Sequence, residues 1–101
     1  MSSLSRECPF EQIIERIKRW LLRAKSIEFV HIYYFESDRK PYHVWMLWKP
    51  NIYMRRGGIR FSSKDDLKRF LKEVILDKEI YIKIKELKDE LNIIGELQKS
   101  A

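Results

Sequence analysis

Two runs of β-branched and aromatic residues, separated by a short polar segment, restrict most strongly what this chain can fold into. Residues 27–36 read IEFVHIYYFE and residues 42–49 read YHVWMLWK, and both have the composition of β-strands. Residues 37–41 (SDRKP) are polar and end in proline, which predicts a turn. Together these features predict an antiparallel hairpin.

Two further short strands are expected after this hairpin. Residues 52–56 (IYMRR) predict a third strand, and residues 59–61 (IRF) predict a fourth. The pair Gly57-Gly58 between them is typical of a hairpin turn. The sequence therefore predicts a four-stranded antiparallel sheet.

A helix is expected on each side of the predicted strands. Residues 9–25 begin with a proline suited to a first helical turn and then repeat apolar residues on one face. After Phe61, Ser62 and Ser63 each precede an aspartate by three residues, close to a capping box, and a second amphipathic segment follows. If both helices cover one face of the sheet, the fold class is α+β.

The last segment differs in character from the first two helices. Its apolar residues step by four and three, which is the period of a coiled-coil seam, and they are Ile80, Ile84, Leu87, Leu91 and Ile94. We therefore expect a helix over residues 78–99 that pairs two copies into a homodimer, with 1–77 as the binding domain and 78–101 as the dimerisation element. The alternative is a helix that packs on the core of its own domain.

The positive charge of the chain is concentrated in one block. The formal net charge is +6, and residues 39–64 contain seven lysines and arginines with no acidic residue, while the remaining segments are close to balance. Aromatic residues lie between these cations. This combination is typical of a surface that binds a polyanion with stackable bases. The alternative is an exposed basic hairpin around a tryptophan core.

Alternation along the strands separates two sets of side chains. The more apolar set is expected to meet the helices. The other set mixes rings with cations, which suits base stacking and phosphate contacts. The rings expected to stack are Tyr33, His43, Trp45 and Tyr53. The side chains expected to contact phosphates are Arg39, Lys49, Arg55, Arg56 and Arg60.

No residue pattern indicates catalysis, a cofactor or a metal. Cys8 is the only cysteine and has no paired base in the sequence, and His31 with His43 is a poor ligand set. No apolar run approaches a membrane span, and the first residues have no apolar leader core, so we expect a cytoplasmic protein. The absence of threonine and the scarcity of asparagine and glutamine favour a thermophilic source.

The order of predicted elements resembles a known family. A first helix, an aromatic four-stranded sheet, a second helix and a zipper-like last helix are similar to the ThermoDBP-type single-stranded DNA-binding proteins of thermophilic archaea. That resemblance covers nearly the whole chain and rests on architecture and composition. It implies binding of single strands in an aromatic and basic cleft, and dimerisation through the terminal helix.

A second, local resemblance concerns residues 48–70, WKPNIYMRRGGIRFSSKDDLKRF. This stretch is similar to the end of the transcriptional coactivator p15 fold, in which a Lys-Pro and basic-Gly segment leads into a short strand and a helix. The helix over 9–25 and the length of the last helix depart from that family. It too implies single-stranded DNA binding and dimerisation.

The sequence therefore favours a non-enzymatic, largely sequence-independent binder of single-stranded DNA or RNA, with DNA favoured, that acts as a homodimer. Stacking requires exposed base faces, and no recognition helix is evident. The alternative is a small protein-interaction or transcription-regulatory module, which in one form would bind duplex DNA through the helix over 9–25.

Overall fold

The computed structural model describes residues 10–49 and 55–100, with the backbone alone for 55–57 and 100. Four strands form one sheet in the order β3-β2-β1-β4. The strands are β1 (Ser26–Tyr34), β2 (Tyr42–Lys49), β3 (Arg55–Phe61) and β4 (Leu87–Asp89). The helices are α1 (Phe10–Arg23), α2 (Lys64–Phe70), its π-helical continuation η2 (Leu71–Ile75), α3 (Lys78–Tyr81) and α4 (Ile93–Ser100). The α+β class is confirmed, but only β1 and β2 of the four strands match predicted strands, because β4 lies where a helix was predicted.

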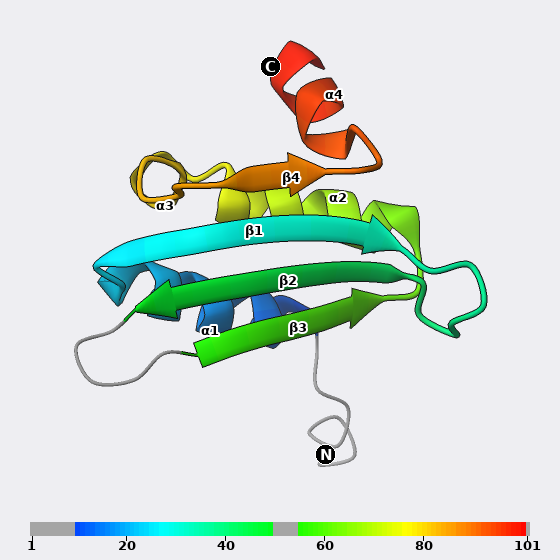
Figure 1. Cartoon of the computed structure of the whole chain (residues 1–101), viewed down its shortest axis with the longest axis horizontal. Helices are drawn as coiled ribbons and strands as arrows, with labels where there is room; N and C mark the ends of the chain where they lie inside the picture. The colour runs from blue at the N-terminus through cyan, green and yellow to red at the C-terminus, as the bar shows by residue number, and fades with distance from the viewer. Residues whose placement is uncertain (1–9, 50–54, 101) are drawn as a thin grey trace.

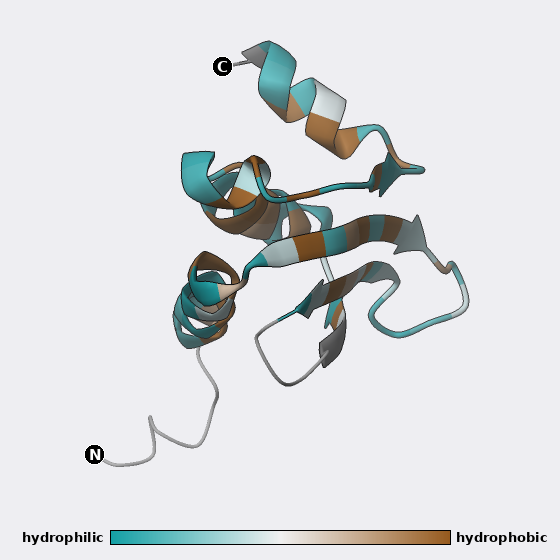
Figure 2. Ribbon diagram, turned by 60° about the vertical axis from the view of Figure 1, so that its left-hand side comes forward, coloured by the Kyte–Doolittle hydropathy of each residue, from teal (hydrophilic) through white to brown (hydrophobic). Residues whose placement is uncertain are grey.

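Helices α1 and α2 lie on the same face of the sheet, behind it in Figure 1 and to one side of it in Figure 2. The core forms between these helices and the strands because the apolar stripe of each helix meets the apolar set of each strand. Leu21 of α1, Leu67 and Phe70 of α2, and Ile32 and Met46 of the strands are all fully buried. No described helix is long and apolar enough to cross a membrane.

The predicted hairpin of β1 and β2 is present, with Tyr33 opposite His43 and His31 opposite Trp45. The predicted turn at Gly57-Gly58 is wrong, because both glycines lie inside β3, which pairs with β2 along its whole length. Of the predicted third strand, residues 52–54 lie outside the described residues. The predicted third and fourth strands are thus replaced, as far as the chain is described, by one strand.

The predicted helix over residues 78–99 is also wrong. The chain forms a short helix, then β4, then α4, and β4 runs parallel to β1, so the sheet is mixed rather than antiparallel. The free edge of β1 explains this, because its backbone groups need partners. Lys85 N–H donates to the carbonyl of Ile27 at 2.9 Å, and Val30 N–H donates to that of Glu86 at 2.9 Å.

The apolar residues predicted for the dimer seam pack inside one chain. Ile80 and Ile94 are buried in the core, and Ile84, Leu87 and Leu91 are partly buried against it. Apolar residues spaced by four and three are therefore buried here by three short elements that pack around one core. Dimerisation itself stays a prediction.

Two polar contacts fix the ends of these short elements. Lys83 Nζ donates to the carbonyls of Leu21, Leu22 and Ala24 at 3.2, 2.6 and 2.8 Å, which satisfies the C-terminal end of α1. Asp89 accepts from the backbone N–H of Leu91 at 3.0 Å and of Ile94 at 2.6 Å, which caps the start of α4.

Candidate nucleic-acid interface

The sheet face opposite α1 and α2 carries a row of rings, and we call it the open face. Neighbouring rings are in contact: Tyr33 lies edge-on to Trp45 with centroids 6.2 Å apart, and Phe35 lies 4.6 Å from His43. Phe29 stacks on His31 at 4.5 Å. Trp45 is 40% exposed and Phe35 is similarly exposed. Rings that are held by neighbours yet exposed on one side can stack on a flat ligand.

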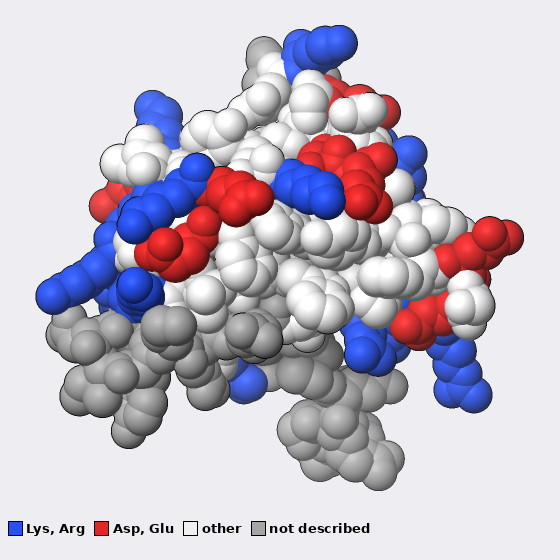
Figure 3. Space-filling view, viewed as in Figure 1, with Lys and Arg blue, Asp and Glu red and all other residues white. Residues whose placement is uncertain are grey.

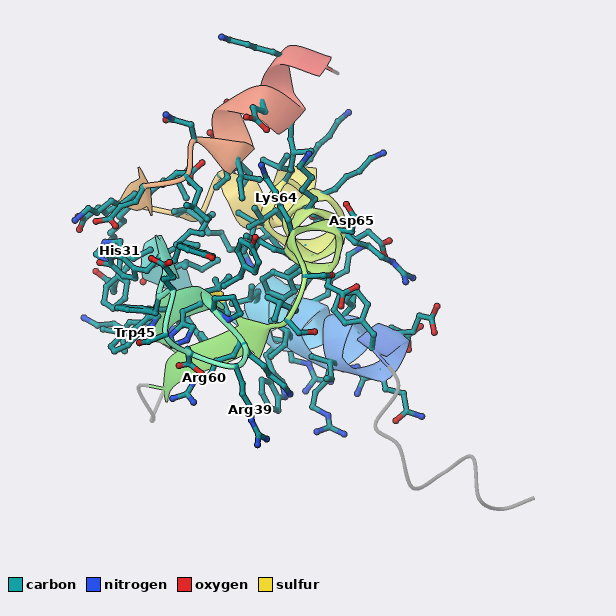
Figure 4. The ribbon with its side chains drawn as sticks, turned by 90° about the vertical axis from the view of Figure 1, so that its right-hand side faces the viewer. His31, Arg39, Trp45, Arg60, Lys64 and Asp65 are labelled. Atoms are coloured by element: carbon teal, nitrogen blue, oxygen red, sulfur yellow. The ribbon has the colours of Figure 1, made fainter. Side chains whose placement is uncertain are left out.

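Two hollows lie at the end of the open face nearest the β1–β2 turn. The ring hollow has a volume of about 350 Å³ and is lined by Phe35, Ser37, Asp38, Arg39, His43 and Trp45. The arginine hollow has a volume of about 450 Å³ and is lined by Asp38, Arg39, Lys40, Gly58 and Arg60. Figure 4 shows Trp45, Arg60 and Arg39 on one side of the molecule and Lys64 with Asp65, at the start of α2, on another. Exposed rings and cations therefore share one small area.

Asp38 lines both hollows, and it contacts His43, which lines the ring hollow. His43 Nε2 donates to Asp38 Oδ2 at 3.1 Å, and the backbone N–H of Lys40 donates to Oδ1 at 3.3 Å. Partial desolvation raises the pKa of the Asp38 carboxyl. The Lys40 N–H, the charge of Arg60 and the contact with His43 outweigh that effect, so the pKa lies below its usual value. Asp38 is therefore an ionised acceptor in neutral solution.

The structure brings together only part of the predicted site. Tyr33, Arg39, Trp45 and Arg60 lie on the open face or at its end. His43 lies there too but is only 6% exposed, so it supports Asp38 and Phe35 instead of offering a free ring. Lys49 is at the other end of β2, where it lies opposite Ser26.

Tyr53 lies outside the described residues, and Arg55 and Arg56 are described by backbone alone. The register pairs Arg56 with Leu47 and Arg55 with Trp48, which is buried in the core. The roles of both arginines in phosphate binding stay predictions.

Charge is not uniformly positive around the open face. Figure 3 shows an uncharged centre and, along β4, acidic and basic side chains side by side. Lys85 pairs with Glu28 at 3.3 Å, and Glu86 Oε2 lies 3.2 Å from His31 Nε2. By contrast, among the described residues no carboxylate lies within 4.0 Å of the cationic groups of Arg39, Lys40 and Arg60. The cations that line the two hollows are thus available for an anionic ligand.

Several residues of the site were not predicted from the sequence. Asp38, Lys40 and Phe35 were taken as parts of a strand end and a turn, and Gly58 as a turn residue. An aspartate five residues before a histidine, across a hairpin turn, was the available signal for the Asp38–His43 contact. The described residues contain no group of three or more potential metal ligands.

Comparisons with protein-family models, with curated proteins and with solved structures found no match for this chain. The resemblance to the ThermoDBP-type proteins and the local resemblance to the coactivator p15 fold stay predictions.

Proposed function

We propose that the open face binds single-stranded nucleic acid without strong dependence on sequence. The observation that carries this proposal is the adjacency of the exposed Trp45 ring to the cations of the arginine hollow. A base stacked on such a ring contributes about 1–3 kcal/mol. Arg39, Lys40 and Arg60 would then neutralise the phosphates on either side of that base.

The path of the bound nucleic acid over the open face follows from the distribution of charge. Glu28, Glu86 and Glu90 border β4 and oppose a phosphate backbone, whereas the β3 side offers cations. A single-stranded nucleic acid that crosses from the β1–β2 turn over β2 towards β3 avoids those carboxylates. Single strands are favoured over duplex because a ring on a sheet surface can reach a base face only when the base is unstacked.

The test is a titration of fluorescently labelled oligo(dT) with the protein at several salt concentrations. Three phosphate contacts predict a log-log slope of roughly −2, from about −0.7 per contact on single strands. The double variant Arg39→Gln/Arg60→Gln should make the slope shallower, at roughly −0.7, because one phosphate contact remains. The matched control, Arg16→Gln/Arg23→Gln, removes the same charge from exposed positions of α1 on the other side of the sheet.

Several outcomes would contradict the proposal. An affinity for oligo(dT) that does not depend on salt would contradict phosphate binding in the arginine hollow. An equal loss of affinity in both double variants would contradict it as well. A preference for duplex over single strand would favour a transcription-regulatory module, and an absence of any binding would favour a protein-interaction module.

A further inference from the structure

Among the described residues, Asp38 is the only acidic one that lines either hollow, and it lines both. An anionic side chain at the centre of a surface suited to phosphates is unfavourable unless it contacts something other than phosphate. Asp38 lines the ring hollow together with Trp45 and Phe35, so its carboxylate is available to the edge of a base that stacks on Trp45.

The Asp38 carboxylate has acceptor capacity left for a ligand. Two oxygens offer about four lone-pair sites, and the described residues use one site on each, for Lys40 N–H and His43 Nε2. The side chain is 32% exposed, so the remaining sites are accessible. The two contacts also hold the carboxylate in one orientation, which reduces the entropy that a ligand would cost by ordering it.

We propose that Asp38 reads the base that stacks on Trp45 and selects guanine. This inference rests on the proposed function and specifies its preferred base. An ionised carboxylate is an acceptor only, and guanine presents two adjacent donors, N1–H and the N2 amino group, on its Watson–Crick edge. The two oxygens of one carboxylate match those two donors side by side.

The other bases match this acceptor less well. Adenine and cytosine each place an acceptor ring nitrogen next to their amino group, and that nitrogen faces the carboxylate unfavourably. Thymine and uracil have one donor, N3–H, between two carbonyl oxygens. The binding surface as a whole would therefore tolerate any sequence, while one position in the bound strand would favour guanine.

The experiment compares three labelled oligonucleotides with the full chain: oligo(dT), the same strand with one central guanine, and the same strand with hypoxanthine there. Hypoxanthine differs from guanine only by lacking the N2 amino group. The wild-type protein should bind the guanine strand about tenfold more tightly than the hypoxanthine strand, because a hydrogen bond to a charged group is lost. Asp38→Asn should bring the two affinities together.

The control variant is Asp65→Asn, which removes one exposed carboxylate from the first turn of α2 and should leave the preference unchanged. Equal wild-type affinities for the guanine and hypoxanthine strands would overturn the guanine inference. In that case, salt-dependent binding of oligo(dT) would still support the proposed function. A guanine preference that survives in Asp38→Asn would overturn the role of Asp38. Failure to bind all three strands would overturn both proposals. Oligo(dT) does not need the guanine contact, and loss of the Asp38 charge should not weaken its phosphate contacts. Oligo(dT) binding by Asp38→Asn that is at least as tight as that of the wild type therefore shows that the variant is folded.

Discussion

Gly58 lies directly opposite Trp45 in the antiparallel pair of β2 and β3. A Cβ atom added at Gly58 would meet nothing within 4 Å, and its backbone does not have a positive φ angle. A glycine inside a strand weakens the sheet and often marks a close approach of a ligand. The space beside the exposed Trp45 ring is therefore open because position 58 has no side chain.

This relationship predicts that Gly58→Val folds but binds single strands more weakly. Valine suits a strand, so the free energy of unfolding should not fall, while its methyl groups occupy space beside Trp45. The control is Gly95→Ala in α4, where an added Cβ also meets nothing within 4 Å. That change should raise stability by up to about 1 kcal/mol and leave affinity unchanged. Denaturant unfolding and oligo(dT) titration measure both effects, and unchanged affinity in Gly58→Val would contradict the prediction.

The two tryptophans of β2 should separate binding from stability. Trp45→Ala should weaken oligo(dT) binding by about 1–3 kcal/mol with little loss of stability, because the ring is 40% exposed. Trp48 is 4% exposed in the core, so Trp48→Ala should cost about 3–5 kcal/mol of unfolding free energy. Urea unfolding and the binding titration, run on both variants, check this. A Trp45→Ala variant that binds like the wild type would remove the stacking role.

The Asp38 carboxyl should titrate below its usual pKa of 3.8. Its contribution to stability is then present above about pH 3.8 and is lost as the pH falls through the lower pKa of the folded state. Arg60→Gln should raise the pKa of Asp38, since the charge of Arg60 is one cause of the shift. Arg39→Gln serves as the matched control. Carboxyl chemical shifts followed by NMR measure the pKa, and an equal pKa in both variants would contradict the electrostatic role of Arg60.

Much of the fold was predictable because it depends on local patterns. Alternation and a polar turn define β1 and β2, and apolar repeats define α1 and the start of α2. The pairing of β4 was not predictable, because it depends on a contact between residues far apart in the sequence. Leu87 of β4 pairs with Val30 at the edge of β1 that β2 leaves free. A period of four and three residues also fits a coiled coil, so the pattern alone favoured the wrong structure.

The candidate site was predictable to a similar extent. Alternation along the predicted strands grouped Trp45 with Arg60, and the register of β2 with β3 places both positions on the open face. Asp38 could not be assigned in this way, because its role depends on how the turn folds back onto His43. The strand pairing of Arg55 and Arg56 was not predictable either, because Gly57-Gly58 continues the strand instead of turning it.

The last third of the chain provides a fourth prediction. Ile80 is fully buried within one chain, so Ile80→Ala should lower the unfolding free energy by about 2–5 kcal/mol. Ile82, which is 81% exposed, is the control, and Ile82→Ala should change stability little. Thermal midpoints at two protein concentrations distinguish a role of Ile80 in the core of one chain from a role in a dimer seam. For a core role, Ile80→Ala should lower the midpoint equally at both concentrations. A midpoint that depends on concentration, with a dependence that Ile80→Ala changes, would indicate a dimer seam.

The most direct measurement follows the three tryptophan indole N–H signals by NMR during titration with oligo(dT). Trp45 lies on the open face, whereas Trp48 is buried on the helix-covered face and Trp20 lies 6.1 Å from it, between ring centroids. We predict a large shift for Trp45 and small shifts for Trp20 and Trp48. Shifts at Trp20 or Trp48 with an unchanged Trp45 signal would contradict binding on the open face.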